Sequence, residues 1–222
     1  MSQVTEQNTA AGRRIESDSF AIIDAEVGEH GLAPDQWAVA RRLIHATGDF
    51  DFGHITAFSD GAIEAGIAAL RAGAPIVVDV GMIAAGLSAK RLEHFGCAVH
   101  GHIGDADVIE RAQARPEATR AEVAMQKAAE TGELDGAIVA VGNAPTALIE
   151  LERLAREEGI RPALVIGVPV GFVSAVEAKD TLAEAADLEW IVTRGRKGGS
   201  PLAVAAVHAL MALAIDRAGD GS

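Results

Sequence analysis

Three stretches in the second half of the chain decide its fold: DGAIVAVGNAPTAL (135–148), PALVIGVPVGFV (162–173) and EWIVTRGRKGGSPLAVAAV (189–207). In each stretch a run of apolar, largely β-branched residues stops at a glycine, and in the first and third a helical pattern follows. This strand–loop–helix order is typical of an open α/β sheet, whose ligands bind at the carboxyl ends of the strands. Three such loops predict one wide pocket, lined by backbone N–H groups and able to hold a large anionic molecule.

The same alternation extends toward the N-terminus. The runs APIVVDV (74–80) and GCAVHGHI (96–103) are typical of strands, and each precedes a helical pattern, over residues 82–95 in the first case. Five strands that alternate with helices predict an α/β fold with a mainly parallel five-stranded sheet and helices on both faces. Two N-terminal helices, expected over residues 15–29 and 36–45, would pack alongside that sheet.

The remaining segments complete this plan. A further helix is expected over residues 61–71, with Asp60 as its N-terminal cap. Residues 47–60 are ambiguous between a loop and a short strand. No internal repeat or low-complexity linker divides the chain, so we expect a single α/β domain over residues 13–222, preceded by a disordered tail at 1–12.

Composition narrows the functional class. The 222 residues are 49% hydrophobic, enough to bury a substantial core, and the net charge of −13 disfavours nucleic-acid binding. The single cysteine, Cys97, excludes an internal disulfide and fits a reducing cytoplasm. No apolar signal-peptide segment is seen at the N-terminus. The run PLAVAAVHALMALAI (201–215) is too short for a membrane span and predicts a buried helix, whose alanines suit close packing in a dimer.

The third loop carries the densest group of cations in this acidic chain. Arg194, Arg196 and Lys197 fall within four positions, directly before two glycines that let the backbone approach a ligand. Pro201 suits the first position of the next helix, whose N-terminus favours an anion. A solvated basic turn is the ordinary alternative, but here glycines and cations coincide at the carboxyl end of a strand. We therefore expect ligand contacts from Arg196, Lys197, Gly198, Gly199 and Ser200.

The other two loops are less polar. In the first, Asn143 can cap a helix or hydrogen-bond a ligand, and Pro145 starts the helix. The second would contribute shape and backbone hydrogen bonds, with Phe172 as an apolar wall. Neither a dinucleotide fingerprint nor a P-loop motif occurs, so nucleotide binding is disfavoured.

A candidate acid–base residue lies in RRLIHATGDFDF (41–52). His45 ends an amphipathic helix just before a glycine turn, and the helical pattern would let its side chain face inward. Imidazole titrates near neutral pH and can therefore donate or accept a proton. Arg42 lies three residues earlier on roughly the same face, and Asp49 and Asp51 can orient the ring or serve as ordinary loop acids. A lone histidine is more often structural, so spacing alone leaves its role open.

A rival cluster follows in GCAVHGHIGDAD. Cys97, His100 and His102 are possible metal ligands, with His94 or Asp105 as a fourth. Their spacing is not that of a zinc signature, and an ordinary strand with partly buried histidines explains the pattern better. Nothing in the sequence marks Cys97 as an activated nucleophile. We therefore expect no metal site.

Six blocks of the sequence are informative because of the order in which they occur along the chain. They are IESDSFAII (15–23), RRLIHATGDFDF (41–52), LRAGAPIVVDVGMIAAGL (70–87), AVGNAPTAL (140–148), GVPVGFV (167–173) and GRKGGS (195–200). In this order they resemble the precorrin-8X methylmutase / cobalt-precorrin-8 methylmutase family of corrin biosynthesis. The resemblance covers nearly the whole chain and is highly specific, although no single block would suffice.

The resemblance implies an α/β homodimer that moves a methyl group from C-11 to C-12 of precorrin-8X or cobalt-precorrin-8, by a 1,5-sigmatropic shift. The product would be hydrogenobyrinic acid or cobyrinic acid, and no cofactor would be consumed. His45 is similar to the family's catalytic histidine. In that role it would protonate, or hydrogen-bond, a ring nitrogen near the migrating group and stabilise charge in the rearranging π-system.

The resemblance also implies substrate contacts outside the glycine-rich loops. The matching positions are Ser19, Arg42, Ser88 and Arg120. Arg120 lies in a family motif whose next residue, a serine, is Ala121 here, so one hydroxyl is lost. Ser88 stands where relatives carry threonine and keeps a hydroxyl. His208 replaces an asparagine common in the last helix.

The implied ligand agrees with the character of the loops. A corrin precursor carries seven carboxylate arms on a broad apolar ring, so it needs a wide pocket, several cations and many N–H donors. Arg42, Arg120 and the third loop would supply the cations, and a neighbouring pathway enzyme would help to deliver the substrate to this acidic protein. Two alternatives remain: a non-catalytic tetrapyrrole carrier, and a metal-dependent enzyme built on His100 and His102.

Overall fold

The computed structural model describes residues 9–219 as helices joined to a central sheet. The helices are α1 (Ala10–Val27), α2 (Pro34–Thr47), α3 (Phe52–Ile55), α4 (Ala62–Arg71), α5 (Gly81–Gly86), α6 (Ala89–Phe95), α7 (Ala106–Gln113), α8 (Arg120–Glu130), α9 (Pro145–Glu157), α10 (Ala175–Glu184) and α11 (Ser200–Gly219). The strands are β1 (Thr56–Phe58), β2 (Ile76–Val78), β3 (Val99–His100), β4 (Ile138–Val141), β5 (Leu164–Gly167) and β6 (Trp190–Thr193).

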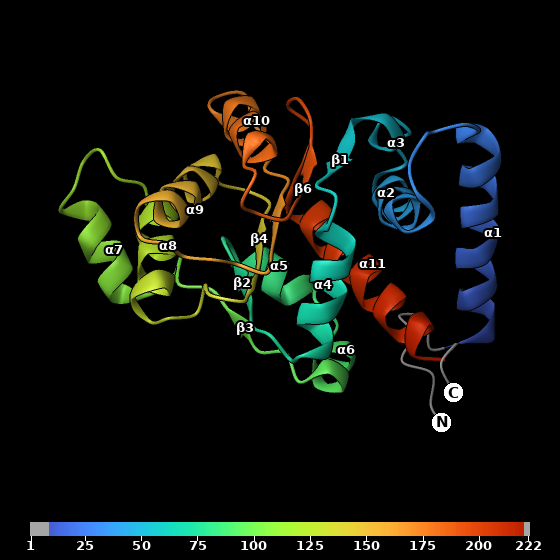
Figure 1. Cartoon of the computed structure of the whole chain (residues 1–222), viewed down its shortest axis with the longest axis horizontal. Coiled ribbons are helices and arrows are strands. Elements are labelled where there is room, and N and C mark those ends of the chain that lie inside the picture. The colour runs from blue at the N-terminus through green and yellow to red at the C-terminus, as the bar shows by residue number, and fades with distance from the viewer. Residues whose placement is uncertain (1–8, 220–222) are drawn as a thin grey trace.

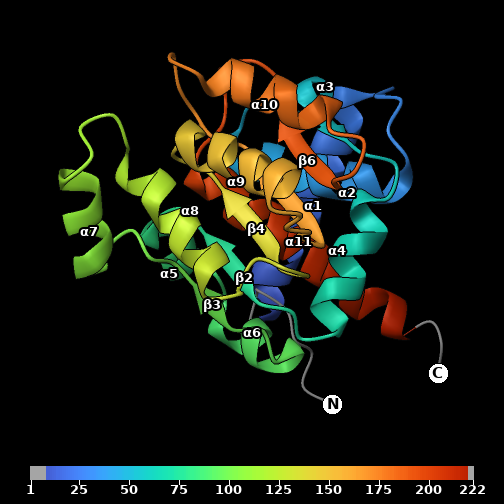
Figure 2. The same ribbon diagram turned by 60° about the vertical axis from the view of Figure 1, so that its left-hand side comes forward.

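The sheet has the strand order β1-β6-β5-β4-β2-β3 within the described residues (Figures 1 and 2). Every neighbouring pair is parallel except β1 and β6, which are antiparallel. The predicted parallel α/β sheet is confirmed, with six strands in place of five. The additional strand, β1, comes from the ambiguous segment 47–60, which also forms α3. Three residues are too few to show an alternating pattern, which is why the sequence did not reveal it.

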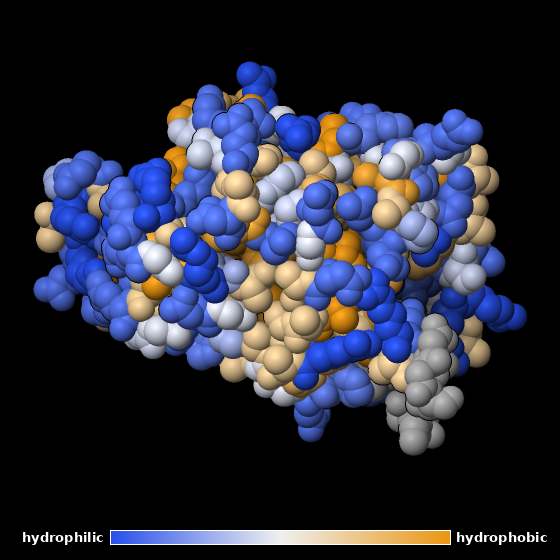
Figure 3. All heavy atoms as spheres, in the orientation of Figure 1, coloured by the Kyte–Doolittle hydropathy of each residue, from blue (hydrophilic) through white to orange (hydrophobic). Residues whose placement is uncertain are grey.

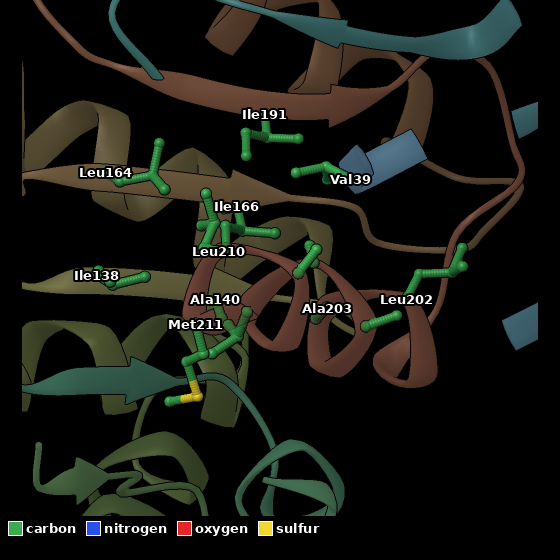
Figure 4. Close-up of a cluster of buried hydrophobic side chains, with 14 of the residues drawn as sticks. Val39, Ile138, Ala140, Leu164, Ile166, Ile191, Leu202, Ala203, Leu210 and Met211 are labelled. Carbon is green, nitrogen blue, oxygen red and sulfur yellow. The ribbon is translucent and has the colours of Figure 1, made fainter. Parts of the chain in front are cut away.

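Both faces of the sheet are covered by helices. Ile138 and Ala140 of β4 face a core shared with α2, α4, α5 and α11, whereas Val139 and Val141 face a core shared with α8, α9 and α10. The first of these cores, with Leu210 of α11 against the strands, is shown in Figure 4. Strands buried on both faces read as continuous apolar runs, so the sequence signal was strong for β4, β5 and β6.

The last helix, α11, lies across one face of the sheet and also packs against α2 and α4. By length and composition alone, Ser200–Ala218 could cross a membrane, but half of that window is buried inside the fold. Ala203 and Ala206 are fully buried, and such small side chains let a helix approach a sheet closely. The prediction of a buried helix is therefore confirmed.

Several predicted helix boundaries are corrected. Helix α1 begins at Ala10, so residues 10–12 of the expected tail are helical, while residues 1–8 lie outside the described residues. The helix expected over residues 82–95 is two helices, α5 and α6. The break falls at Ser88, whose extended backbone and side-chain hydroxyl cap α6 by accepting from the N–H of Arg91.

One predicted helix cap is wrong, and one of the two roles left open for Asn143 is excluded. Gly61 occupies the N-cap of α4 without a side-chain hydrogen bond, so Asp60 does not cap that helix. Ala144 occupies the N-cap of α9, so Asn143 does not cap it either. Pro145 does begin α9, as predicted. The N–H groups just before α9, those of residues 142–144, are bound instead by a side chain that follows β2, described below.

Candidate active site

The three glycine-rich loops meet at the carboxyl edge of the sheet, as parallel strands require. A Cβ on Gly142, in the β4–α9 loop, would lie 2.7 Å from the Cα of Ser200, at the start of α11. A Cβ on Gly198 would collide with the carbonyl oxygen of Val168 and with Pro169 in the β5–α10 loop. The glycines therefore let three backbones touch, and the predicted convergence of the loops is confirmed.

The third loop is fixed from inside the protein. The carbonyl oxygen of Lys197 accepts from the Thr193 hydroxyl at 2.9 Å and from the Lys179 ammonium at 3.0 Å. The N–H of Gly199 donates to Val168 at 2.8 Å, and Gly199 has φ +135°, which side-chain-bearing residues rarely adopt. Gly199 and Ser200 are themselves buried, so they shape the loop from within.

The cationic side chains of the same loop point outward. The Lys197 ammonium forms ion pairs with Asp49 at 2.5 Å and with Asp51 at 2.7 Å, and these carboxylates raise its pKa. Its hydrogen bond also holds the pKa of Asp49 below the ordinary value. Arg196 lies with its guanidinium 5.4 Å from the ring centre of Phe172, which is 84% exposed. The third loop therefore presents exposed cations, with Phe172 of the second loop beside Arg196, and Lys197 links the loop to the segment that follows α2.

The first loop is held by a residue that the sequence analysis missed. The Asp79 carboxylate, at the end of β2, accepts from the N–H groups of Gly142 at 3.1 Å, Asn143 at 2.8 Å and Ala144 at 2.7 Å. Asp79 is only 1% exposed, and this burial raises its pKa despite the three N–H donors. These N–H groups, at the start of α9, therefore serve an internal anion, and only the exposed side chain of Asn143 faces outward.

His45 lies in the last turn of α2, and its side chain is exposed. The prediction that it faces inward is therefore wrong: Leu43 and Ile44 take the buried positions of that turn. The imidazole packs against the ring of Phe20 in α1, with centroids 5.2 Å apart at an interplanar angle of 69°. This edge contact orients the ring beside solvent, which suits a group that must reach a bound molecule.

Arg42 accompanies His45 on the same side of α2. It is partly buried, bonds Glu16 at 3.0 Å, and lies 5.2 Å from the ring centre of Phe20. A hollow of about 240 Å³ opens here between α1, α2 and α11. Its lining includes Glu16, Phe20, Arg41, Arg42, Arg91 and Asp216. Pockets that enclose drug-sized ligands measure about 300–1,000 Å³, so this hollow alone does not enclose a larger molecule.

The other predicted contact residues are dispersed. Ser19 in α1 donates its hydroxyl to the carbonyl of Ile15 at 2.7 Å. The backbone N–H of Ser88, at the N-cap of α6, donates to Nε2 of His208 at 3.0 Å, so that unexpected histidine accepts a hydrogen bond there. Arg120 is exposed at the start of α8, on the face of the sheet opposite α2. A single chain therefore does not bring Arg120 to His45 (Figure 1).

The rival histidine cluster forms an ion-pair network. His102 contacts Asp105 through Nδ1 at 2.9 Å and Glu133 through Nε2 at 2.6 Å, and His100 contacts Glu133 at 2.9 Å. Partial burial lowers the pKa of His102, but the Glu133 and Asp105 carboxylates outweigh it, so the net shift is upward. Among residues 9–219, no group of three or more His, Cys, Asp or Glu is arranged to hold a metal ion. Cys97 is buried, with its thiol 3.8 Å from the carbonyl oxygen of Leu70.

Hydrophilic side chains dominate the face shown in Figure 3, including the region over α7 and α8, while apolar ones gather near its centre over α4. Against that background, a doubly wound sheet with converging glycine-rich loops, two outward cations and an exposed histidine defines a ligand-binding α/β enzyme of the open-sheet class.

Comparison with known proteins places this enzyme in a family. The family model for precorrin-8X methylmutase matches residues 14–213. The chain is 50% identical to the cobalt-precorrin-8 methylmutase of Leptospira interrogans, covering 95% of this chain and 98% of the relative. It is 41% identical to the precorrin-8X methylmutase of Pseudomonas aeruginosa, covering 90% and 94%. A solved precorrin-8X methylmutase structure from Thermus thermophilus superposes with a TM-score of 0.87 at 55% identity, covering 93% and 98%.

The chain therefore belongs to the precorrin-8X methylmutase family. It is an isomerase of cobalamin biosynthesis, that is, an intramolecular methyl transferase. This agrees with the resemblance found in the six sequence blocks, which fall in α1, in the second half of α2 and the segment after it, on β2 with its flanking segments, and in the three glycine-rich loops.

Proposed function

We propose that this enzyme moves a methyl group from C-11 to C-12 of precorrin-8X or cobalt-precorrin-8, with His45 as the acid. The relatives carry these substrates in their names. The observation that carries the assignment of His45 is its position: an exposed imidazole at the end of α2, joined through Asp49 and Lys197 to the cationic third loop. Proton donor and carboxylate-binding groups thereby share one edge of the sheet.

The reaction is balanced within the substrate. The bond between the methyl carbon and C-11 breaks as the bond to C-12 forms, and the π-electrons of the ring rearrange. A proton or hydrogen bond from the imidazole to a nearby ring nitrogen stabilises the charge that develops. That proton leaves the product again, so no cofactor or external reactant is consumed. Phe20 fixes the ring of His45 for this role.

The carboxylate arms of the substrate require several cations. In this proposal Arg42, Arg120, Arg196 and Lys197 bind the arms, with Asn143, Ser19 and Ser88 as polar contacts and Gly198, Gly199 and Ser200 as the frame of the third loop. Arg42 and Lys197 already pair with Glu16 and with Asp49 and Asp51. A substrate carboxylate therefore competes with internal acids for these cations. Because salt screens the attraction between exposed cations and the carboxylate arms, substrate binding should weaken at high salt.

We further propose a homodimer as the functional unit. The hollow beside Arg42 is smaller than a corrin precursor, and Arg120 lies on the opposite face of the sheet from His45. A second copy would enclose the substrate and bring the two residues to one site. Exposed apolar side chains on α1, Ile15 and Ile22, favour burial in such an interface. Sedimentation of the purified protein as a monomer at catalytic concentration would contradict this.

Replacement of His45 tests the proposed role. His45→Ala should reduce the rearrangement at least about 100-fold, as expected for loss of a general acid, while one equivalent of product still binds. His54→Ala, at an exposed histidine in α3, is the matched control and should retain full activity. The measurement is the change of the chromophore's absorbance with time. Unchanged activity of His45→Ala would refute the role.

The same time course separates two remaining questions. A non-catalytic tetrapyrrole carrier would bind one equivalent without any change of the chromophore. Running the assay with the metal-free and the cobalt-containing precursor identifies the preferred substrate. The 50% identical relative named for the cobalt form makes that precursor the first to test.

The cellular setting follows from the same features. We propose a cytoplasmic location, supported by the lone Cys97 as a buried free thiol. Transient contact with the enzymes that precede or follow it would help a protein of net charge −13 acquire a polyanionic substrate. Full diffusional capture by the isolated enzyme, with no co-purifying pathway enzyme, would argue against such contacts.

A further inference from the structure

A buried lysine lies beneath the third loop. Lys179, in the first half of α10, is 0% exposed and ranks among the largest fully buried side chains of the described residues. Its ammonium donates to the carbonyl oxygen of Lys197 at 3.0 Å. The acid next to it in sequence, Asp180, is exposed, and no ion pair to Lys179 occurs among residues 9–219. A lysine in such surroundings calls for a functional explanation.

Burial of this ammonium works against folding. A charged group that leaves water without a carboxylate partner loses hydration that one neutral carbonyl does not replace. Burial accordingly lowers the pKa of Lys179 to about 8. An apolar side chain of similar length would fill the same space without this penalty. The lysine therefore does not serve stability.

The hydrogen bond from Lys179 to the Lys197 carbonyl sets the orientation of the third loop. Lys179 and the Thr193 hydroxyl both donate to one carbonyl, that of Lys197. They turn this peptide inward on one side of the loop, while Gly198 rests against the β5–α10 loop on the other. With the peptide fixed on both sides, the side chains of Arg196 and Lys197 project to the surface.

We propose that Lys179 is a positioning residue for the methyl transfer: its ammonium holds the Lys197 carbonyl and thereby aims the two loop cations at the carboxylate arms of the substrate. This rests on the proposed binding role of the loop. Lys179 does not touch the substrate, and it acts through the peptide that it orients. Its removal should relax the loop and weaken substrate binding while the fold becomes no less stable.

The test compares two substitutions on the same helix. Lys179→Met removes the ammonium and keeps the length of the side chain. Leu182→Ala, three residues further on, removes a fully buried apolar side chain and serves as the control for simple destabilisation. For Lys179→Met we expect a Tm equal to or above that of the parent and kcat/KM lower by about 10- to 100-fold, mostly through KM, as loss of positioning predicts. Leu182→Ala should show the reverse. Its Tm should be lower than that of the parent, and its kcat/KM should equal the parental value when the assay temperature is well below that Tm.

A second variant distinguishes positioning from a general packing effect. Thr193→Val removes the other donor to the same carbonyl. Because both donors act on one peptide, their combined effect on kcat/KM should be smaller than the product of the two single effects. Independent effects that multiply would overturn the proposal, as would a lowered Tm of Lys179→Met that accounts for its lost activity.

Failure of the underlying assignment has a separate signature. Lys197→Met and Arg196→Met should each raise KM if the loop binds substrate. If neither does, the loop is not the binding site and the proposed function of these cations fails. If both do, but Lys179→Met has the kcat/KM of the parent, the positioning role of Lys179 alone is refuted.

Discussion

The first and third glycine-rich loops lie side by side at the same edge of the sheet, yet they are held in opposite ways. Beneath the first, the buried carboxylate of Asp79 gathers three backbone N–H groups. Beneath the third, the buried ammonium of Lys179 and a hydroxyl gather one backbone carbonyl. The N–H donors of the first loop are therefore bound within the protein, whereas the cations of the third loop face outward, where Lys197 pairs with Asp49 and Asp51.

This difference corrects a general expectation about such folds. Helix N-termini at the carboxyl edge of an α/β sheet are common anion sites, and the sequence predicted N–H groups lining the pocket at each loop. In the loop before α9, three backbone N–H groups are already bound by Asp79. Recognition of an anionic ligand at this edge therefore depends on side-chain cations from the third loop and from α2, with a smaller share for backbone donors.

The largest expected effect on stability comes from removing the anion under the first loop. Asp79→Ala leaves three N–H groups without their acceptor, and an unsatisfied buried donor costs about 1–3 kcal/mol. Because water can enter the space left behind, we expect a loss of about 3–5 kcal/mol in the free energy of unfolding. Urea denaturation measures it. Asp79→Asn, which keeps one acceptor oxygen, should lose less.

Lys179→Met provides the contrast to that experiment. If the two buried charges were equivalent structural anchors, both substitutions would destabilise the protein to a similar degree. We expect instead that the Asp79 substitution lowers the free energy of unfolding and the Lys179 substitution does not, because the fold requires the anion and does not require the cation. A stable, folded Asp79→Ala protein with parental unfolding free energy would show that the first loop does not need its carboxylate.

These anchors also mark the limit of what the sequence could reveal. The strands β4, β5 and β6 were predictable because burial on both faces makes them continuously apolar. The loops were predictable because glycine and proline interrupt those runs. Asp79 and Lys179 were not predictable as buried anchors, because aspartate and lysine are common surface residues. Only the packing of α9 and α10 encloses them.

The candidate site likewise has features that the sequence predicts and features that it does not. The grouping of His45 with Arg42 was predictable, because both belong to one helix. The ion pairs that join Lys197 to Asp49 and Asp51 span almost 150 positions, and no local pattern encodes them. The outward direction of His45 was also missed, since the apolar stripe of α2 ends at Ile44 and the next residue turns away from the core.

A smaller effect is expected where the loops touch. Gly142→Ala places a methyl group 2.7 Å from the Cα of Ser200, and overpacking of this kind costs about 1–3 kcal/mol. The first and third loops must separate to admit it, so activity should fall together with stability. Differential scanning calorimetry and the absorbance assay measure the two effects.

Gly81→Ala is the matched control for that substitution. Gly81 also follows a strand at the carboxyl edge, but a Cβ there meets nothing within 4 Å and its φ is not positive. It begins α5, where alanine is favoured over glycine by up to about 1 kcal/mol. Equal destabilisation by the two substitutions would mean that close approach of the loops is not what Gly142 provides.

The smallest effect concerns a third anchor, His102, which holds the start of α7 as Asp79 holds the start of α9. Its imidazole lies between Asp105 and Glu133, with the His100 ring and the Lys127 ammonium as further neighbours of these acids. Burial lowers the pKa of His102, but the two carboxylates raise it more, so the folded state binds its proton more tightly than the unfolded state does. The contribution to stability is therefore complete below about pH 6.5, the ordinary value for histidine. It is lost as the pH rises through the raised pKa.

We expect a loss of about 1 kcal/mol in the unfolding free energy over this window, since the cluster is partly exposed. His102→Gln should remove that slope, while His54→Gln, at an exposed histidine, should retain it. A slope that persists in His102→Gln would assign the pH dependence to another group and show that the proton of His102 does not stabilise the start of α7.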